Sequence, residues 1–254
     1  MAVTSQLAGT AFGIDIGGTG IKGGIVDLAT GDLVGERFRI DTPQPATPDA
    51  VTDTAAEVAN HFGWTGPIGV DFPGVVQNGV VHTAANVDKS WIGTSLVDTL
   101  SAKVPGQVTA LNDADAAGLA EVRYGAGVGQ NGLVIMVTFG TGIGIALISG
   151  GKLVPNAELG HIELNGHDAE TKAAASARER DGLTWEHWTK RASKYLVALE
   201  NLLWPDLFIL GGGISKKPEK WVPGLKTRTP LVVAKLINNA GIVGSALAAH
   251  EAAS

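Results

Sequence analysis

Two glycine-rich segments carry residue types suited to binding phosphate. The first reads Asp15-Ile-Gly-Gly-Thr-Gly-Ile-Lys22 and the second reads Thr138-Phe-Gly-Thr-Gly-Ile-Gly144. Glycine lets backbone N–H groups approach an anion, threonine adds a hydroxyl, and a carboxylate at a strand end can hold hydrated Mg²⁺. The pair predicts two turns, possible products of an internal duplication, that hold donor phosphates, with Asp15 as a candidate Mg²⁺ ligand. Two ordinary hairpins are the alternative.

A third polar site lies at Asn112-Asp113, where the apolar run Val108–Leu111 meets an alanine-rich segment. Aspartate at such a junction most often caps the helix N-terminus, and we accept this role, or a first-turn role, for Asp115. A carboxylate fixed at a helix start can also accept the proton of a sugar hydroxyl that attacks phosphorus. For Asp113 both roles stay open.

Glu158-Leu-Gly-His161 can direct two polar side chains into one space, although a single histidine is more often structural. The other five histidines are not spaced in the chain as metal ligands usually are. They are His61, His82, His167, His187 and His250. No H-E-x-x-H, G-x-S-x-G or G-x-x-x-x-G-K-[ST] pattern occurs. Gly127, Gly129 and Gly132 match the G-x-G-x-x-G motif of dinucleotide-binding folds. In those folds the motif follows a strand, whereas here it precedes the expected strand Leu133–Val137, so we exclude dinucleotide binding at this segment.

The elements that must position these residues alternate between strand and helix. Expected strands are Phe12–Ile16, Ile21–Asp27, Leu33–Ile40, Ile68–Phe72, Val108–Leu111, Leu133–Val137, Ile143–Ile148 and Leu207–Leu210. Expected helices are one capped by Thr47 with Val51, Ala55, Val58, Ala59 and Phe62 inward, then Ser95–Lys103, Ala114–Tyr124, Asp181–Trp204 and Gly241–Ala253. In the long helix, Trp185, Trp188, Ala192, Tyr195, Leu199 and Leu202 share a face. The alternation predicts an α/β fold with antiparallel hairpins at two places.

Composition excludes several classes of protein. The chain has 254 residues, no cysteine and a net charge of −6, so disulfides, thiol nucleophiles and cysteine-based zinc sites are excluded and nucleic acid is not an expected partner. Met1–Gly9 lacks the basic and apolar parts of a secretion signal, so we expect a cytoplasmic protein. The uncharged stretch Tyr124–Gly151 contains glycine turns and predicts two buried strands, not a membrane helix.

Five segments, taken in order, resemble the ROK family of sugar kinases within the actin-like ATPase superfamily. They are Asp15–Lys22, Leu111–Asp115, Thr138–Gly144, Glu158–His161 and Leu210–Gly213. The resemblance implies an α/β, two-lobed actin-like (ribonuclease H-like) fold with the active site in the interlobe cleft. We expect residues 1–111 and 238–254 in the first lobe and residues 112–237 in the second.

The resemblance also implies a role for each matched residue. Asp113 is the expected general base for the sugar 6-hydroxyl. The expected sugar-binding residues are Asn86, Asn112, Asp113, Glu158, His161 and Glu170. The expected phosphate- or nucleotide-binding residues are Gly17, Gly18, Thr19, Gly20, Lys22, Thr138, Gly140, Thr141, Gly142, Gly211, Gly212 and Gly213. Asp15 is expected to help hold Mg²⁺.

Two features narrow the resemblance. The cysteine zinc cluster usual in the family is missing, so we expect no zinc, and the segments Thr83–Trp91 and Gly166–Glu170 are similar to bacterial polyphosphate glucokinases. This similarity implies phosphoryl transfer from inorganic polyphosphate, ATP or both to the 6-hydroxyl of glucose. It also implies that mannose is an acceptor and that the protein is a homodimer. Lys216, Lys217, Lys220, Lys226 and Arg228 then line a track for polyphosphate, or form an ordinary solvated loop.

Other functions fit less well. An ATP-only ROK kinase for another hexose or an N-acetylated hexosamine is the main alternative. A sugar-responsive repressor of this family needs a helix-turn-helix, and only eleven residues precede the first expected strand. An actin-like filament protein or chaperone leaves Glu158–His161 unexplained.

Overall fold

The computed structural model describes residues 9–84 and 87–253. It divides into two compact units, here called unit 1 and unit 2. Unit 1 extends to Ala120 and resumes at Asn238, and unit 2 extends from Glu121 to Ile237. The change of unit therefore lies within helix α3 (Asp113–Tyr124), whereas the expected boundary preceded this helix.

Unit 1 is built on one five-stranded sheet in the order β3-β2-β1-β4-β7. Its strands are β1 (Thr10–Ile16), β2 (Gly20–Asp27), β3 (Phe38–Asp41), β4 (Ile68–Phe72) and β7 (Val108–Asn112), beside the small hairpin β5 (Val76–Gln77) and β6 (Val80–Val81). Its helices are α1 (Pro48–His61), α2 (Leu96–Ser101), most of α3, and α7 (Ala240–Ala253). The first three strands pair antiparallel, and β1, β4 and β7 run parallel.

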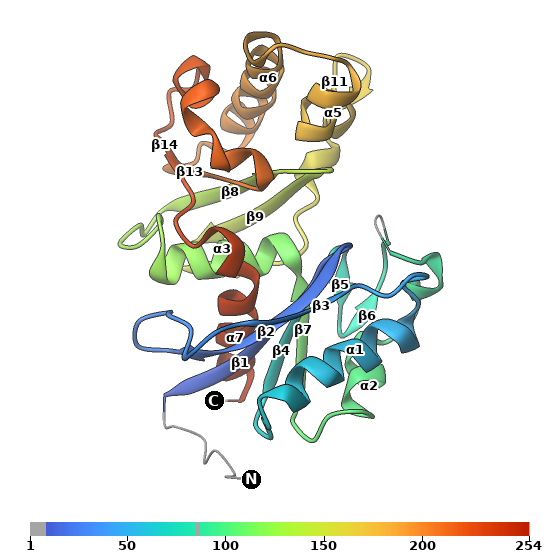
Figure 1. Cartoon of the computed structure of the whole chain (residues 1–254). Helices are drawn as coiled ribbons and strands as arrows, with labels where there is room; N and C mark the ends of the chain where they lie inside the picture. The colour runs from blue at the N-terminus through green and yellow to red at the C-terminus, as the bar shows by residue number, and fades with distance from the viewer. Residues whose placement is uncertain (1–8, 85–86, 254) are drawn as a thin grey trace. The chain divides into compact units, whose positions relative to one another are not determined.

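The alternation of side chains along β1 assigns the two faces of this sheet. Phe12, Ile14 and Ile16 are buried in a core that includes Val51 and Val58 of α1. The intervening residue Gly13 faces α7, because a Cβ atom there would meet the backbone of Ile242. Helices α1 and α7 consequently cover opposite faces of the sheet (Figure 1).

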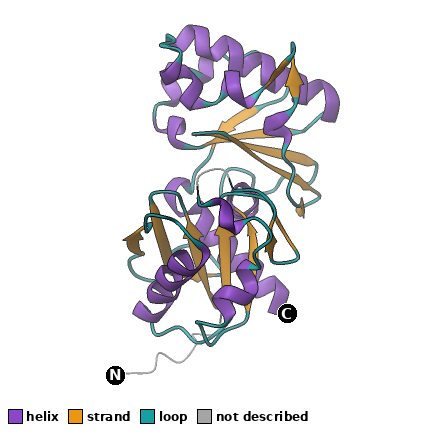
Figure 2. Ribbon diagram, turned by 90° about the vertical axis from the view of Figure 1, so that its right-hand side faces the viewer, coloured by secondary structure: helices purple, strands orange, loops and turns teal. Residues whose placement is uncertain are grey.

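Unit 2 contains a second five-stranded sheet, in the order β10-β9-β8-β13-β14. These strands are β8 (Leu133–Phe139), β9 (Ile143–Ser149), β10 (Lys152–Val154), β13 (Leu207–Gly211) and β14 (Leu231–Val233), and a separate hairpin joins β11 (Glu163–Leu164) to β12 (His167–Asp168). The helices are α4 (Glu170–Ala173), α5 (Ala175–Arg180) and α6 (Trp185–Leu203). Phe139, Trp188, Tyr195 and Trp221 form the aromatic centre of its core. Figure 2 shows both units as strands with helices packed against them.

The two sheets have the same topology. In each unit the first three strands form an antiparallel meander, and the fourth and fifth strands pair parallel beside the first. Both glycine-rich segments form the turn between the first and second strands of their sheet. The predicted α/β class and the two antiparallel hairpins are confirmed, and the shared strand order supports the internal duplication.

Three expected elements are shorter in the structure. The strand expected over Leu33–Ile40 is wrong for its first half, because Gly35 has φ +85° and only β3 pairs continuously with β2. The helix expected from Asp181 begins at Trp185, because Gly182 has φ +59° and the Thr184 hydroxyl caps the new start. The helix expected over Ser95–Lys103 is limited to Leu96–Ser101 with Ser95 as its cap.

Two side-chain expectations are also corrected. The Thr47 side chain makes no capping hydrogen bond, although Pro48 does occupy the first turn of α1. Leu202 is 69% exposed and does not join the buried face of α6. Among the described residues, no helix is both long and apolar enough to cross a membrane.

The contact between α7 and the sheet gives a test of the fold. A Cβ atom on Gly69 of β4 would lie 1.7 Å from the carbonyl oxygen of Ser245, so the backbone of α7 would have to move. We expect Gly69→Ala to lower the free energy of unfolding by about 2–3 kcal/mol, as overpacking of a core does. Urea denaturation measures this loss.

Gly24→Ala in β2 is the matched control, because the nearest atom to a Cβ there is at the end of the Leu33 side chain, at 3.2 Å, and the next neighbours lie at ordinary contact distances of 3.8 and 3.9 Å. We expect this variant to change the unfolding free energy by less than about 1 kcal/mol. Equal midpoints for Gly69→Ala and the wild type would contradict the packing described here.

Candidate active site

A row of charged residues crosses the sheet of unit 1. Strand pairing places Arg39 beside Lys22, Lys22 beside Asp15, and Asp15 beside Asp71. Residues paired across strands project on the same face, so these side chains are neighbours. The Lys22 ammonium lies 2.9 Å from Asp15 Oδ2. The structure thus brings together the predicted Asp15 and Lys22 and adds Arg39 and Asp71.

Asp71 is fully buried, and sequence reasoning missed it. The Ser245 hydroxyl donates to Asp71 Oδ2 at 3.0 Å, while Asp71 Oδ1 has no hydrogen-bond partner in the part of the chain that the structure describes. Burial raises the pKa of this carboxyl well above its ordinary value, and the charges of Asp15 and Asp113 raise it further. The signal for Asp71 lay in the pairing of β1 with β4, because the run Ile68–Phe72 is otherwise apolar.

The first glycine-rich turn joins β1 to β2, one residue pair beyond Asp15 and Lys22. Its backbone closes through a hydrogen bond from Gly17 N to Gly20 O of 3.0 Å, and the Thr42 hydroxyl donates to Gly17 O. The Arg39 guanidinium donates to the carbonyl oxygen of Thr19 at 2.7 Å. The turn that contains Gly17, Gly18, Thr19 and Gly20 therefore has cationic side chains beside it, as phosphate binding requires.

Asn112, not an aspartate, caps helix α3. Its Oδ1 accepts from the backbone N–H groups of Ala114 at 2.8 Å and Asp115 at 3.1 Å, and its amide donates to Gly74 O. Asp115 instead occupies the first turn and is buried. Asp113 is exposed, and one of its oxygens accepts from Ala114 N at 2.8 Å. Asn86, the other sugar-binding candidate in this half of the chain, lies outside the described residues.

The second glycine-rich turn lies in unit 2. Gly140 N donates to Gly142 O at 2.9 Å, the Thr138 hydroxyl donates to Gly144 O at 3.3 Å, and the Ser176 hydroxyl donates to Thr141 O at 2.6 Å. Gly211, Gly212 and Gly213 follow the neighbouring strand β13, where Gly211 pairs with Thr138. Gly212 has φ +85°, and a Cβ atom there would lie 2.3 Å from the carbonyl oxygen of Phe139. The structure therefore brings these two predicted groups together.

Glu158, His161 and Glu170 also gather in unit 2. Glu158 Oε2 lies 3.9 Å from His161 Nε2, and Glu170 Oε2 accepts from the backbone N–H of Ile143 at 2.7 Å. A Cβ atom on Gly142 would lie 2.3 Å from the same Glu170 oxygen, so the glycine leaves room for this carboxylate in the position that it has here. Glu170, one of the sugar-binding candidates, thus lies directly against the second glycine-rich turn.

Two of these groups have shifted pKa values. The pKa of His161 is raised, mainly because its Nδ1 lies 2.8 Å from Asp168 Oδ2 and also because Glu170, Asp168 and Glu158 are nearby anions. The pKa of Glu158 is raised, mainly by burial and also by Glu170, while His161 lowers it. These carboxylates and the imidazole can accept from or donate to sugar hydroxyls.

The expected run of cations after the triple glycine does not act as one group. Lys216, Lys217 and Lys220 are exposed in the short helical turns that follow Gly213. Arg228 is engaged elsewhere, because it stacks 3.9 Å from the Trp204 ring and donates to Glu200 O. Lys220 also lies 5.8 Å from the centre of the Trp185 ring, and Lys226 is exposed further along the chain. Lys216 and Lys217 are therefore the exposed lysines nearest in sequence to the triple glycine.

The residues present fit a magnesium ion bound together with a phosphate donor. Mg²⁺ usually takes one or two carboxylates and completes its coordination with water and substrate phosphates, and Asp15 supplies one carboxylate beside the first turn. Within residues 9–84 and 87–253, no group of three or more histidine, aspartate or glutamate side chains has the arrangement of a protein-only metal site.

Comparison with known proteins shows that the chain belongs to the ROK family. A sequence profile of the ROK family matches residues 11–179. A polyphosphate glucokinase from Mycobacterium tuberculosis is 62% identical over 238 residues, which cover 93% of this chain and 90% of that protein.

Solved structures match over nearly the whole chain. Inorganic polyphosphate/ATP-glucomannokinase from Arthrobacter sp. strain KM is 56% identical, with a TM-score of 0.91 over 96% of this chain and 99% of that one. A ROK family glucokinase from Streptomyces griseus, in complex with glucose and AMPPNP, is 26% identical, with a TM-score of 0.81 over 96% of this chain and 100% of that one.

Asp71→Asn tests the buried carboxyl. Its folded-state pKa lies above the ordinary value of 3.8, so the stability that this group contributes is fully present below about pH 4 and is lost as the pH rises through the raised pKa. The asparagine amide of the variant cannot ionise, so only the wild type loses this stability as the pH rises. We therefore expect the unfolding free energy of Asp71→Asn minus that of the wild type to increase from about pH 4 to about pH 9. Urea denaturation across this range measures the difference, and a decrease would contradict the raised pKa.

Proposed function

Because the chain belongs to the ROK family, we propose that it is a sugar kinase that transfers a phosphoryl group from inorganic polyphosphate or ATP to the 6-hydroxyl of glucose. Its fold is the two-lobed, actin-like α/β fold of ROK sugar kinases. The observation that carries the proposal is the similarity to a polyphosphate glucokinase over almost the full length of the chain.

Asp113 is the proposed general base. It is exposed at the first residue of α3, where the cap by Asn112 fixes the local backbone. The 6-hydroxyl oxygen attacks the terminal phosphorus of the donor, its proton passes to the Asp113 carboxylate, and the donor leaves one phosphoryl group shorter. Phosphoryl transfer depends mainly on positioning and charge neutralisation, so one well-placed carboxylate is sufficient for the proton.

Glu158, His161 and Glu170 are the proposed ligands of the other sugar hydroxyls, with Asn86 and Asn112 as further candidates. The first three present anionic and imidazole groups within one small region of unit 2. Since the amide of Asn112 already donates to Gly74 O and its oxygen caps α3, its contribution is mainly to hold Asp113.

The two glycine-rich turns are the proposed donor sites. Gly17, Gly18, Thr19, Gly20 and Lys22 bind phosphate oxygens in unit 1, and Thr138, Gly140, Thr141 and Gly142 bind them in unit 2, with Gly211, Gly212 and Gly213 on the adenosine side of ATP. Asp15 would hold Mg²⁺ together with the donor, and the ion supplies positive charge that offsets the charge of the phosphates. Lys22 and Arg39 add fixed positive charge beside the first turn.

Several finer points belong to the same proposal. We propose that the enzyme uses Mg²⁺ as cofactor, binds no zinc and accepts mannose as a second sugar. We also propose that it is a homodimer and is located in the cytoplasm. An ATP-only kinase for another hexose or an N-acetylated hexosamine is the second candidate, and the polyphosphate names of two close relatives favour the first.

Asp113→Asn tests the general base. The amide keeps the size of the side chain but cannot accept the proton, so we expect kcat for glucose to fall by about 10²–10⁴-fold with either donor. Formation of glucose 6-phosphate from nucleotide-free polyphosphate and from ATP, with Mg²⁺, measures the loss. An unchanged thermal midpoint shows that the variant is folded, and near-normal turnover would contradict the role of Asp113.

The double variant Lys216→Ala, Lys217→Ala tests the polyphosphate track. A long polyanion gains more from added cations than ATP does, so we expect KM for polyphosphate to rise about tenfold and KM for ATP to change less than about twofold. Lys194→Ala, at an exposed position on α6, is the control. Equal effects on the two donors would favour the solvated loop.

A further inference from the structure

Asp168 is engaged at both of its carboxylate oxygens by residues of the proposed sugar site. Its Oδ2 lies 2.8 Å from His161 Nδ1, and its Oδ1 accepts from the backbone N–H of Glu170 at 2.9 Å. The side chain of Asp168 is 38% exposed, so it is partly shielded from water. One carboxylate therefore joins the end of the Glu158–His161 segment to the start of α4.

The contact with His161 determines which ring nitrogen is free. A carboxylate can only accept, so His161 Nδ1 must carry the hydrogen in this contact. His161 Nε2 then points toward the Glu158 carboxylate, 3.9 Å away, and is the nitrogen available to a sugar hydroxyl. Asp168 thus fixes both the orientation of the ring and its tautomer.

The contact with Glu170 fixes the start of a very short helix. Helix α4 contains only residues Glu170–Ala173, so its orientation depends on the groups that hold its first residue. With its backbone N–H bonded to Asp168, Glu170 extends its carboxylate to the N–H of Ile143, at the end of the second glycine-rich turn. The position of Asp168 therefore acts directly on Glu170, a sugar-binding candidate.

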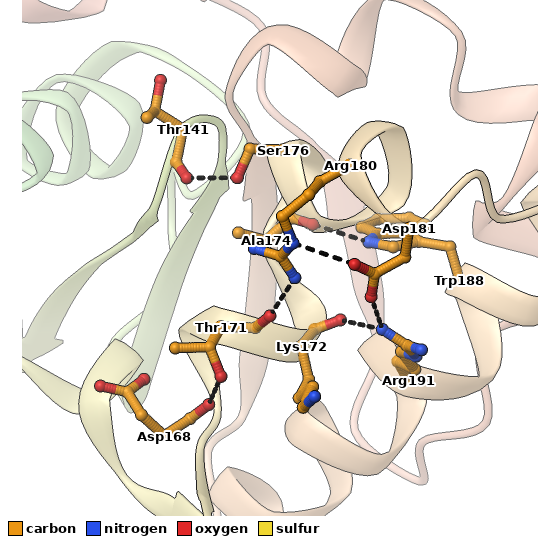
Figure 3. Close-up of polar contacts among 10 residues, drawn as sticks. All are labelled: Thr141, Asp168, Thr171, Lys172, Ala174, Ser176, Arg180, Asp181, Trp188 and Arg191. Atoms are coloured by element: carbon orange, nitrogen blue, oxygen red, sulfur yellow. Dashed lines mark hydrogen bonds and ion pairs between the residues drawn. The ribbon is translucent and has the colours of Figure 1, made fainter.

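Asp168 is itself held by a network that Figure 3 shows. The Thr171 hydroxyl donates to Asp168 O at 2.7 Å, and Arg180 donates to Thr171 O at 2.6 Å. Asp181 accepts from Arg180 at 2.9 Å and from Arg191 of α6 at 2.7 Å. The backbone of Asp168 is consequently tied through these residues to α6, the longest helix of unit 2. On the N-terminal side of Asp168, the backbone is held by the pairing of Asp168 with Glu163 in the β11–β12 hairpin.

We infer that Asp168 is a positioning residue of the sugar site, which holds the His161 ring and the Glu170 backbone in the geometry that binds glucose. This inference rests on the proposed function. Asp168 acts through these two residues and is not assigned a contact with substrate. Its loss should therefore weaken glucose binding more than it slows the chemical step.

Asp168→Asn is the test of this role. The amide is neutral and cannot satisfy the His161 ring as the carboxylate does, so we expect KM for glucose to rise about tenfold, as when one hydrogen bond to a charged group is lost. We expect kcat and KM for polyphosphate to change less than about twofold. Asp206→Asn is the control, because Asp206 also accepts a backbone hydrogen bond in unit 2, from Leu133 N, away from the sugar-binding candidates.

A second readout does not require activity. The pKa of His161 is raised chiefly by Asp168, while Glu158 and Glu170 also face the ring, so Asp168→Asn should lower the pKa and leave part of the shift in place. An NMR titration of the His161 ring measures this change. In the wild-type protein above that pKa, ring ¹⁵N shifts should show the proton on Nδ1, a measurement that needs no variant.

The outcomes separate this inference from the proposed function. A wild-type His161 with its proton on Nε2, an unchanged His161 pKa in Asp168→Asn, or an equal rise in KM in Asp206→Asn would overturn the positioning role. A wild-type protein that phosphorylates neither glucose nor mannose would overturn the proposed function, and the NMR results would still decide whether Asp168 fixes the ring.

Discussion

The close approach of α7 to the sheet of unit 1 is the constraint on which this half of the protein depends. Gly13 and Gly69 lack the Cβ atoms that would strike the backbone of Ile242 and Ser245, and Gly244 of α7 comes equally close to Ala116 of α3. The helix can therefore lie directly on β1 and β4. Its Gly241 lies against the carboxylates of Asp15 and Asp71, and Ser245 bonds Asp71. The last helix of the chain thereby positions acidic groups on the first and fourth strands.

The same strand order in both units places a glycine-rich turn at the same topological position, but the surroundings differ. In unit 1 the turn is followed by Lys22 and flanked by Arg39, whereas in unit 2 the turn is tied by neutral or anionic groups, through Ser176 and Glu170. The cationic side chains thus lie beside the turn of unit 1, each paired with an aspartate, Lys22 with Asp15 and Arg39 with Asp41. The turn of unit 2 is coupled to the sugar-binding candidates, because Glu170 belongs to both groups.

Local patterns in the sequence were sufficient for the hairpins, the turns and most helices, since alternation and glycine spacing act over a few residues. Asp71 was missed because its importance comes from pairing with Asp15, more than fifty positions away. Asp168 was missed because its partners meet it only through the fold of a short hairpin and the start of α4. The sequence left a capping role open for Asp113 and Asp115. The cap is Asn112, because its extended strand position lets its oxygen reach two N–H groups.

The proposed function assigns the phosphates of polyphosphate and of ATP to the same two glycine-rich turns. The most direct measurement is the initial rate of glucose 6-phosphate formation by the wild-type protein from nucleotide-free polyphosphate, at increasing concentrations of the non-hydrolysable ATP analogue AMPPNP. The account predicts turnover from polyphosphate and competitive inhibition, with KM for polyphosphate rising and kcat unchanged. Turnover that AMPPNP does not inhibit, or that it inhibits through kcat alone, would contradict a shared donor site.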